Sequence, residues 1–444
     1  MISIAHKIEL VPNNKQKTYF RKAFGCARFA YNWGLAEWQR RHEQGEKCTA
    51  YEIKKSFNAI KREQFPFVTE VTKYATQQPF INLGSAFEKF FENLKKGEVS
   101  YPKFKKKRDN AGSFYFGGDK IVLSEKNENS KNFLSMPHNK KGKRQYLRIP
   151  YLGWVKMTEK LRFNGKINSV VISQKGDKFF ASFSVKIMEA EYKRTHPAKS
   201  RKKNRKVGID LGVKTALVLS DGISIDNPKP FQHYSRKITK LSRQLDKKVY
   251  ARTKQDKLNG VKKSNNYLKQ SQKLANIHRR IASIRLNFIQ KTTTILVRHY
   301  SQMVVEDLDC VGIIASKHVR TPIFDVSMGE VLRELKYKSA LYGTTLLKAG
   351  RFFPSSRICS RCGNVGGPLT LRQRIYRCKE CGLVIDRDYN ASLNLLGLLE
   401  NHQIGVDYPE YTPEDLTALR RRFTKNGIAT SKVETGRQHK PPAL

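Results

Sequence analysis

Four cysteines in the C-terminal part of the chain form two CxxC pairs, Cys359–Cys362 and Cys378–Cys381, with fifteen residues between the pairs. Each pair turns two thiolates towards one point, and two pairs complete the tetrahedral ligand set that Zn²⁺ prefers, with Zn–S distances of about 2.3 Å. Gly363 and Gly382 follow the second cysteine of each pair, where a tight turn favours glycine. Four sulfur ligands leave no position for water, so the spacing predicts one structural zinc ion. The alternative is four unrelated cysteines in a reduced protein.

The rest of the chain is strongly basic. Its 444 residues include 86 Lys or Arg and 38 Asp or Glu, which gives a formal net charge of +48. Such a surplus indicates a polyanionic partner, usually nucleic acid. Membrane lipid is the weaker alternative, because the basic residues spread along the whole chain and no apolar run reaches the ~18 residues of a membrane span.

Length and cysteine usage set further bounds. At ~100–200 residues per domain, the chain has room for two to four domains. An odd number of cysteines, seven, with one tight cluster is typical of a reducing cytosol and a metal site. Because MISIAHKIEL at the start has no signal-peptide pattern, we expect a cytoplasmic, nucleoid-associated protein.

The N-terminal half reads as a strand, aromatic helices and a small β domain. Alternating isoleucines predict a strand over 2–10, and stripes of Phe, Tyr and Trp at helical spacing predict helices whose aromatic faces pack in a core. Pro79 should start or kink the second of these helices. Short strand-like runs predict a β domain over 113–195, with a hairpin turn at Lys175–Gly176–Asp177.

The C-terminal half alternates strands and helices. Residues 207–226 read as a hairpin, 235–300 as a helix-rich region, 303–308 as a short strand, 326–342 as a helix and 344–347 as a strand. From about residue 400 the chain has little apolar content, which predicts a flexible tail.

Several acids stand out in this basic chain. Asp210 lies inside the apolar run VGIDLGV, Glu306 ends MVVE, and Asp386 and Asp388 lie in DRDYNAS directly after the cysteines. A carboxylate in an apolar strand is costly unless it is paired or binds a cation. Three such groups around two Mg²⁺ ions would suit phosphodiester hydrolysis. The alternative is that each acid pairs with a nearby Lys or Arg.

Together these motifs resemble a known family. GIDLG, a strand ending VVEDL and then DRDYNAS, with a CSRC…CKEC ribbon before the last motif, is similar to the split RuvC nuclease of TnpB. The TnpB family comprises RNA-guided nucleases of insertion sequences and is related to compact type V CRISPR effectors. PNNKQKTYFRKAFGCARFAYNWGL, YPKFKKKRD and LGWVK in the N-terminal half agree, and the resemblance covers roughly residues 1–400.

The resemblance implies a multidomain α+β fold. It comprises an RNase H-like RuvC nuclease domain with a zinc-ribbon insertion, a β-barrel wedge domain and a helical recognition domain. The implied boundaries are 1–12 and 113–196 for the wedge domain, 13–112 for the recognition domain, 197–354 and 383–400 for the nuclease domain, 355–382 for the zinc ribbon, and 401–444 for the flexible tail.

The resemblance also implies an activity. Asp210, Glu306 and Asp388 match the three RuvC acids, which would hold two catalytic Mg²⁺ ions. The protein would carry a guide RNA, open double-stranded target DNA next to a short flanking motif, and cut both strands at one site. Because residues two apart diverge by about 200° on a helix, we expect Asp386 to face away from Asp388 and to cap the turn or pair with a base.

Two groups of residues are candidate nucleic-acid contacts. A basic loop could clamp phosphates, or could simply be solvated. A second segment aligns with the family region that reads the flanking motif, since Gln and Lys can contact base edges and Tyr can stack; alternatively it is an ordinary helix start. The loop comprises Lys103, Lys105, Lys106, Lys107 and Arg108, and the second group comprises Tyr51, Lys73, Tyr74 and Gln77.

Other functions remain open at this stage. The chain could be a guide-RNA-dependent DNA binder or repressor without cleavage, although all three acids are present. It could serve as a type V CRISPR effector, or be a conventional transposase that recognises transposon ends without RNA. A zinc-ribbon nucleic-acid-binding protein without enzymatic activity would leave the acidic motifs unexplained.

Overall fold

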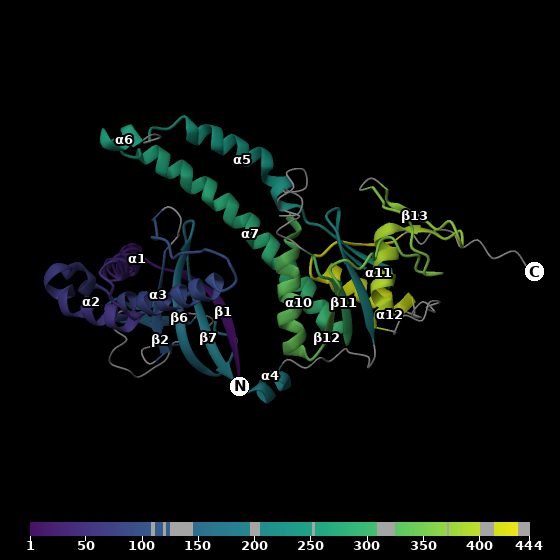
Figure 1. The fold of residues 1–444 in the computed structure, drawn as a ribbon, viewed down its shortest axis with the longest axis horizontal. Coiled ribbons are helices and arrows are strands. Elements are labelled where there is room, and N and C mark those ends of the chain that lie inside the picture. The colour runs from purple at the N-terminus through teal and green to yellow at the C-terminus, as the bar shows by residue number, and fades with distance from the viewer. Residues whose placement is uncertain are drawn as a thin grey trace, which may run out of the picture. The chain divides into compact units, whose positions relative to one another are not determined.

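The computed structural model describes residues 1–107, 112–118, 121–124, 145–195, 205–250, 254–308, 325–370, 373–399 and 413–433. The chain divides into two compact units, Met1–Thr195 and His196–Leu444 (Figure 1). None of the described helices is long and apolar enough to cross a membrane.

The first unit is built on a seven-stranded sheet with the strand order β2-β6-β7-β1-β5-β4-β3. The N-terminal strand β1 pairs antiparallel with β7 over Ile2–Leu10 and with β5 at its end, so it belongs to the same sheet as these later strands. No described residues of the outer strands β2 and β3 pair with each other, so closure into a barrel stays a prediction. The strands are β1 (Ile2–Val11), β2 (Ser113–Gly117), β3 (Val122–Ser124), β4 (Tyr146–Ile149), β5 (Gly153–Met157), β6 (Lys166–Lys175) and β7 (Lys178–Ile187).

Helices with buried aromatic faces complete this unit. Capping boxes at Asn13 and Thr49 satisfy the first backbone N–H groups of α1 and α2. Trp38 of α1 stacks on Phe87 of α3 with ring centroids 3.9 Å apart, which supports the predicted aromatic core. The helix α3 passes through Pro79 without ending there. The bounds are α1 (Asn14–Glu43), α2 (Ala50–Gln64), a 3₁₀ turn η1 (Pro66–Glu70), α3 (Lys73–Leu94) and α4 (Glu189–Thr195).

The second unit contains a mixed six-stranded sheet in the order β12-β11-β8-β9-β10-β15. Its first half is parallel, because β8, β11 and β12 are joined by helical crossovers, and its second half is antiparallel, because β8, β9 and β10 follow as hairpins. The strands are β8 (Lys206–Leu211), β9 (Thr215–Leu219), β10 (Ile223–Asp226), β11 (Gln302–Glu306), β12 (Thr345–Ala349) and β15 (Thr430–Lys432).

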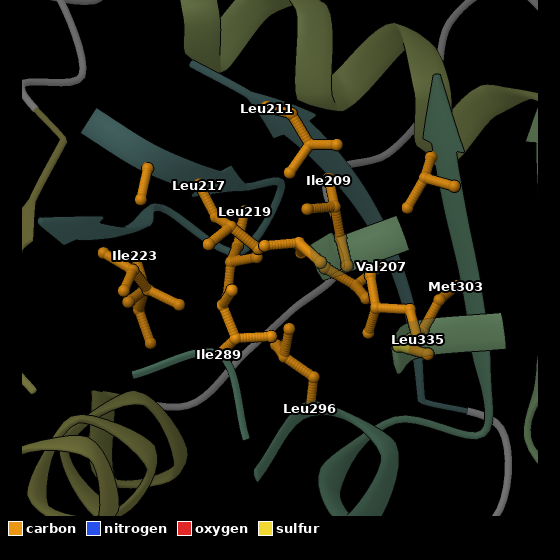
Figure 2. Packing of buried hydrophobic residues seen from close by; sticks show 14 of the residues in the cluster. Val207, Ile209, Leu211, Leu217, Leu219, Ile223, Ile289, Leu296, Met303 and Leu335 are labelled. Atoms are coloured by element: carbon orange, nitrogen blue, oxygen red, sulfur yellow. The ribbon is translucent and has the colours of Figure 1, made fainter. Parts of the chain in front are cut away.

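Helices cover this sheet. One face packs on α7 and α10 through a core of strand residues such as Val207 and Ile209 and helix residues such as Ile289 and Leu335 (Figure 2). The backbone of α11 packs directly against β8. A Cβ atom added to Gly208 of β8 would lie 2.0 Å from the carbonyl oxygen of Ser392 in α11. The helices are α5 (Pro230–Asp246), α6 (Lys254–Leu258), α7 (Asn265–His299), α10 (Met328–Tyr342), α11 (Arg387–Gly397) and α12 (Pro413–Lys425).

The prediction of a flexible tail from residue 401 is wrong for the part of the tail that the structure describes, residues 413–433. There the chain forms α12 and the edge strand β15, which pairs antiparallel with β10. Leu419, Phe423 and Ile428 are buried in the core of the second unit. Few apolar residues are present, but Leu419 and Phe423 fall on one face of α12 and Ile428 follows the helix, and together they pack in the core.

Candidate functional site

The four cysteines come together as predicted. Their sulfur atoms all lie within 4.8 Å of one another, with Cys359 Sγ and Cys381 Sγ 3.6 Å apart and the same distance between Cys362 Sγ and Cys378 Sγ. A tetrahedral zinc with bonds of about 2.3 Å separates its sulfurs by about 3.8 Å, so the spacing fits. Burial raises the pKa of the Cys378 thiol, but hydrogen bonds from backbone N–H groups outweigh burial and lower this pKa to about 7, which favours a thiolate.

A short ribbon connects this cluster to α11. The strands β13 (Ile375–Arg377) and β14 (Val384–Asp386) pair antiparallel on either side of Cys378 and Cys381, and α11 begins at the next residue. Gly382 has a φ of +69°, the conformation that the predicted knuckle turn needs. Cys359, Cys378 and Ile385 of β14 pack with Tyr389 and Leu393 of α11 in one buried cluster. The ribbon therefore supports the first turn of α11 directly.

The three predicted acids line a single cavity of about 960 Å³. Asp210 lies near the end of β8 and Glu306 ends its parallel neighbour β11, so both carboxylates emerge at the same edge of the sheet. Asp388 enters from the first turn of α11. Sequence reasoning selected these three residues, and the fold brings them to one place from positions far apart in the chain.

Burial and, after it, mutual repulsion act on the acids of the cavity. Burial, and then the charges of Glu306 and Asp388, raise the pKa of Asp210 well above its usual range. Burial also raises the pKa of Glu306, opposed by a hydrogen bond that Ser355 Oγ donates to its carboxylate and reinforced by the charge of Asp388. Three carboxylates held together in this way are hard oxygen donors of the kind that Mg²⁺ prefers.

Asp388 also has arginine partners. Arg374 Nη1 lies 3.3 Å from its Oδ2, and Arg387 Nη2 lies 3.1 Å from its Oδ1. Asp388 is therefore paired with two bases in this structure, as the alternative to a metal site predicts. The acids are also not packed as tightly as the cysteines, whose ligand atoms form the one metal-sized group of His, Cys, Asp and Glu among the described residues.

Asp386 takes the role expected of it at the helix start. It is the N-cap of α11, and its Oδ1 accepts a hydrogen bond of 2.9 Å from Tyr389 N. Burial raises its pKa, and this backbone hydrogen bond opposes the shift. Asp386 is not among the residues that line the cavity, whereas Asp388 is. The two aspartates thus diverge as the helical geometry predicted.

Three residues that sequence reasoning missed fix the loop between the cavity and the cysteines. Ser355 contacts Glu306, as described above. Asn394 Nδ2 donates to the carbonyl oxygens of Ser355 and Ile358, both at 2.7 Å. Asn390 donates to Ile358 O at 2.7 Å and accepts from Ser360 N at 3.0 Å. The i, i+4 spacing of the two asparagines in α11 is the signal that could have identified them.

A fourth, buried acid also lines the cavity. Asp325 is 3% exposed, accepts hydrogen bonds from the backbone N–H groups of Phe231 and Gln232, and pairs with Arg285 at 2.6 Å. It thus caps the first turn of α5 from a distant part of the chain. This contact fixes the start of α5 beside the cavity.

The predicted nucleic-acid contacts lie in the first unit. Tyr51 is in the first turn of α2 and is 73% exposed. Lys73, Tyr74 and Gln77 lie in the first two turns of α3, as a helix start, and Lys73 Nζ lies 5.4 Å from the centre of the Tyr74 ring. Their role in reading DNA stays a prediction.

The basic loop is not uniform. Lys103, Lys106 and Lys107 are exposed, whereas Lys105 is partly buried with its Nζ 3.8 Å from the centre of the Tyr31 ring. Burial lowers the pKa of Lys105, and its backbone exchanges two hydrogen bonds with Asn32. Lys105 is therefore a packing residue in this structure as well as a candidate contact. Arg108 lies outside the described residues.

Three family models match the chain. A model described as "Helix-turn-helix domain" of OrfB from IS605 matches 1–47, one described as "Probable transposase" of the same group matches 187–316, and one described as "Cas12f1-like, TNB domain" matches 329–395. The second includes Asp210 and Glu306, and the third includes the four cysteines and Asp388. In residues 1–47 the structure has one strand and one long helix, β1 and α1.

Curated relatives match over most of the chain. "Putative RNA-guided DNA endonuclease InsQ" of Escherichia coli (strain K12) is 28% identical over 408 residues, which cover 88% of this chain and 91% of that protein. "Putative RNA-guided DNA endonuclease" of Streptomyces pristinaespiralis is 28% identical and covers 88% of each chain. "CRISPR-associated endodeoxyribonuclease Cas12f1" of Sulfoacidibacillus thermotolerans is 24% identical over 43% of this chain and 45% of its own length.

The matches to OrfB models over 1–47 and 187–316, to the Cas12f1-like model over 329–395, and to relatives along most of the chain agree with the motif order of the sequence. Along most of its length this chain is therefore similar to the TnpB (OrfB) proteins of IS605-type insertion sequences and to curated RNA-guided DNA endonucleases.

Proposed function

We propose that the protein is an RNA-guided DNA endonuclease of an insertion sequence that cuts double-stranded DNA next to a short flanking motif. The observation that carries the proposal is the convergence of Asp210, Glu306 and Asp388 on one cavity at the edge of a mixed sheet. The positions of the acids, two on neighbouring parallel strands and one in the first turn of a helix, support the expected RNase H-like RuvC domain. The names of the relatives, RNA-guided DNA endonuclease and endodeoxyribonuclease, support the same activity.

The three carboxylates would hold two Mg²⁺ ions, which would activate water and stabilise the leaving oxygen. The raised pKa values of Asp210 and Glu306 support a cation site, because a nearby positive charge would relieve the repulsion between them. Ser355 would keep the Glu306 carboxylate turned into the cavity. Arg374 and Arg387 would release the oxygens of Asp388 when the ions bind, and their guanidinium groups could then contact the DNA phosphates.

The four cysteines would hold one structural Zn²⁺. The ribbon would then act as a brace for α11, because β14 runs from the metal site into the N-cap Asp386. The asparagines of α11 would tie the same helix to the loop that carries Ser355. In this arrangement the zinc contributes to cleavage only through the position of Asp388.

A guide RNA would supply sequence specificity by base pairing, while the protein would hold the RNA and the RNA–DNA hybrid through their backbones. The net charge of +48 supports such a partner. Tyr51, Lys73, Tyr74 and Gln77 are proposed to contact the flanking motif, and the exposed lysines of the basic loop are proposed to contact phosphates.

The proposal can be tested on the full chain purified with its RNA. Sequencing should find a discrete RNA with a constant scaffold and a variable 3′ end, and matched duplex DNA should be cut in Mg²⁺ but not in EDTA. The ion pairs of Asp388 with Arg374 and Arg387 favour one rival, a guided DNA binder without cleavage. That rival is correct if matched DNA is bound with RNA-dependent specificity but stays intact in Mg²⁺.

A further inference from the structure

One face of α5 carries a stripe of cations. Arg236, Lys240, Arg243 and Lys247 are all exposed and fall at i, i+4, i+7 and i+11, which places them in one row along the helix. These four residues, called here the α5 stripe, line a shallow groove of about 470 Å³ with Ser235, Thr239 and Gln244. With a rise of 1.5 Å per residue, the row extends over about 16 Å.

The opposite face of α5 is already used. Its apolar residues pack towards α7, which runs alongside it (Figure 1), and Gln270 of α7 donates to Leu241 O and to Gln244. No salt bridge to the α5 stripe is found within the described residues, and Asp246 is the single acid of the helix. Within the described part of the chain, the stripe is therefore a positive surface whose four cations form no salt bridge.

The stripe leads to the carboxylate cavity. Ser235 lines both the groove and the cavity, and Phe231 and Gln232 of the same helix also line the cavity. Asp325 and Arg285 hold this end of α5 in place. A strand of nucleic acid bound along the stripe would therefore stay in contact with α5 as far as Ser235. There it would reach the cavity that the three acids line.

We propose that the α5 stripe binds the phosphates of a single DNA strand and leads that strand into the carboxylate cavity. The inference rests on the proposed nuclease function, since it assigns the path of its substrate. A strand presents one charge per about 3.4 Å, so the stripe would face four or five phosphates. We choose DNA over the guide RNA because the polymer on this path enters the proposed cutting site, and RNA contact is an outcome of the test.

The test compares a charge-removing variant with two controls in the full chain bound to its RNA. Lys240→Ala with Arg243→Ala removes two cations of the stripe, and Lys240→Arg with Arg243→Lys keeps both charges. Arg421→Ala with Lys425→Ala removes two exposed cations of α12, which lines neither the groove nor the cavity. Single-turnover cleavage of matched DNA and binding of that DNA are measured across a salt series.

We expect the stripe variant to cut about tenfold more slowly at 150 mM salt. The slope of log rate against log salt should also become shallower by about 1.4, because the variant lacks two cations and each phosphate contact on a single strand contributes about 0.7 to the slope. Guided target binding should stay near the wild-type value, because base pairing and contacts elsewhere hold the hybrid. The charge-preserving and α12 variants should cut at the wild-type rate. Equal rates for the stripe and α12 variants would overturn the inference.

A photo-crosslink identifies the bound polymer. A benzophenone side chain is placed at Thr239, within the groove, in a protein that also carries Asp388→Asn. We expect crosslinks to the DNA strand; crosslinks to RNA alone, or none, would overturn the inference. If the wild-type protein fails to cut matched DNA, the proposed function fails, and the crosslink still decides the path of the strand.

Discussion

The cysteine ribbon and the carboxylate cavity differ in how the chain assembles them. The ribbon takes its four ligands from residues 359–381, whereas the cavity takes its acids from β8, β11 and α11. The sulfurs already lie at metal-binding distances, while Asp388 is paired with two arginines. A local ligand set forms with its own hairpin, but a distributed one depends on every element that brings it together.

The two regions meet at α11. Its first turn carries Asp388, its N-cap Asp386 ends the ribbon strand β14, and Asn390 and Asn394 hold the loop between the regions. Damage to the ribbon should therefore reach the cavity through this helix. Variants that damage one region and leave the other unchanged in sequence test whether the cavity depends on the ribbon.

Breaking the ribbon should have the largest effect. Cys378→Ser leaves three thiolates, and structural zinc sites contribute roughly 10–16 kcal/mol of apparent binding energy that is coupled to local folding. We expect loss of bound zinc, protease sensitivity of residues 355–397 and a large fall in cleavage, although no acid has changed. Cys48→Ser, outside the cluster, is the control. Wild-type cleavage by a verified zinc-free Cys378→Ser protein would contradict the brace.

Forcing β8 and α11 apart should damage the cavity while sparing the ribbon. In Gly208→Ala the new Cβ would meet Ser392 O at 2.0 Å and Leu396 N at 2.6 Å, and both are backbone atoms that cannot rotate away. We expect a loss of about 3 kcal/mol or more in the free energy of unfolding, together with reduced cleavage and normal zinc content. The control is Gly397→Ala on the same helix, where a Cβ meets nothing within 4 Å. Equal stability of the two variants, measured by urea unfolding, would show that the sheet adjusts.

A buried acid outside both regions should give a smaller, pH-dependent effect. Burial raises the pKa of Asp221 to about 6, opposed by the hydrogen bond from Tyr300. Because the folded-state pKa lies above the unfolded value, this group stabilises the protein most at low pH, and its contribution falls as pH rises from about 4 to 6. Relative to Asp221→Asn, the wild-type protein should lose up to about 3 kcal/mol over that window. Parallel stability curves for the two proteins would contradict this assignment.

The basic loop of the first unit should give the smallest effect. Lys106→Ala with Lys107→Ala removes two exposed cations, so RNA affinity should fall by up to about tenfold and depend less steeply on salt, without a change in preferred target. Lys105→Ala should instead lower stability, since this side chain packs on Tyr31. An unchanged salt dependence in the double variant would show that the loop is only solvated.

The cysteine cluster and the acids could be selected from sequence because their signals are local. CxxC spacing specifies the zinc ligands, and acids within apolar runs draw attention to Asp210 and Glu306. The resemblance to TnpB then assigned these two acids and Asp388 to one site. The divergence of Asp386 from Asp388 followed from helix geometry, which left a cap or an ion pair open for Asp386. Ser355 and Arg374 could not be selected, because each takes its role from a partner outside its own motif, Glu306 for Ser355 and Asp388 for Arg374. The segment 413–433 was missed because overall polarity concealed a narrow apolar stripe.

The central claim is that the carboxylate of Asp388, and not that of Asp386, belongs to the cutting site. The most direct measurement is Mg²⁺-dependent cleavage and guided DNA binding by Asp210→Asn, Asp386→Asn and Asp388→Asn, each purified with its RNA. Asn keeps the shape of Asp but lacks the charge that a cation requires. Asp210→Asn and Asp388→Asn should bind matched DNA and leave it uncut, whereas Asp386→Asn should cut, with a modest loss of stability from the weakened cap. Full cutting by Asp388→Asn, or an equal loss of cutting in Asp386→Asn, would contradict the account.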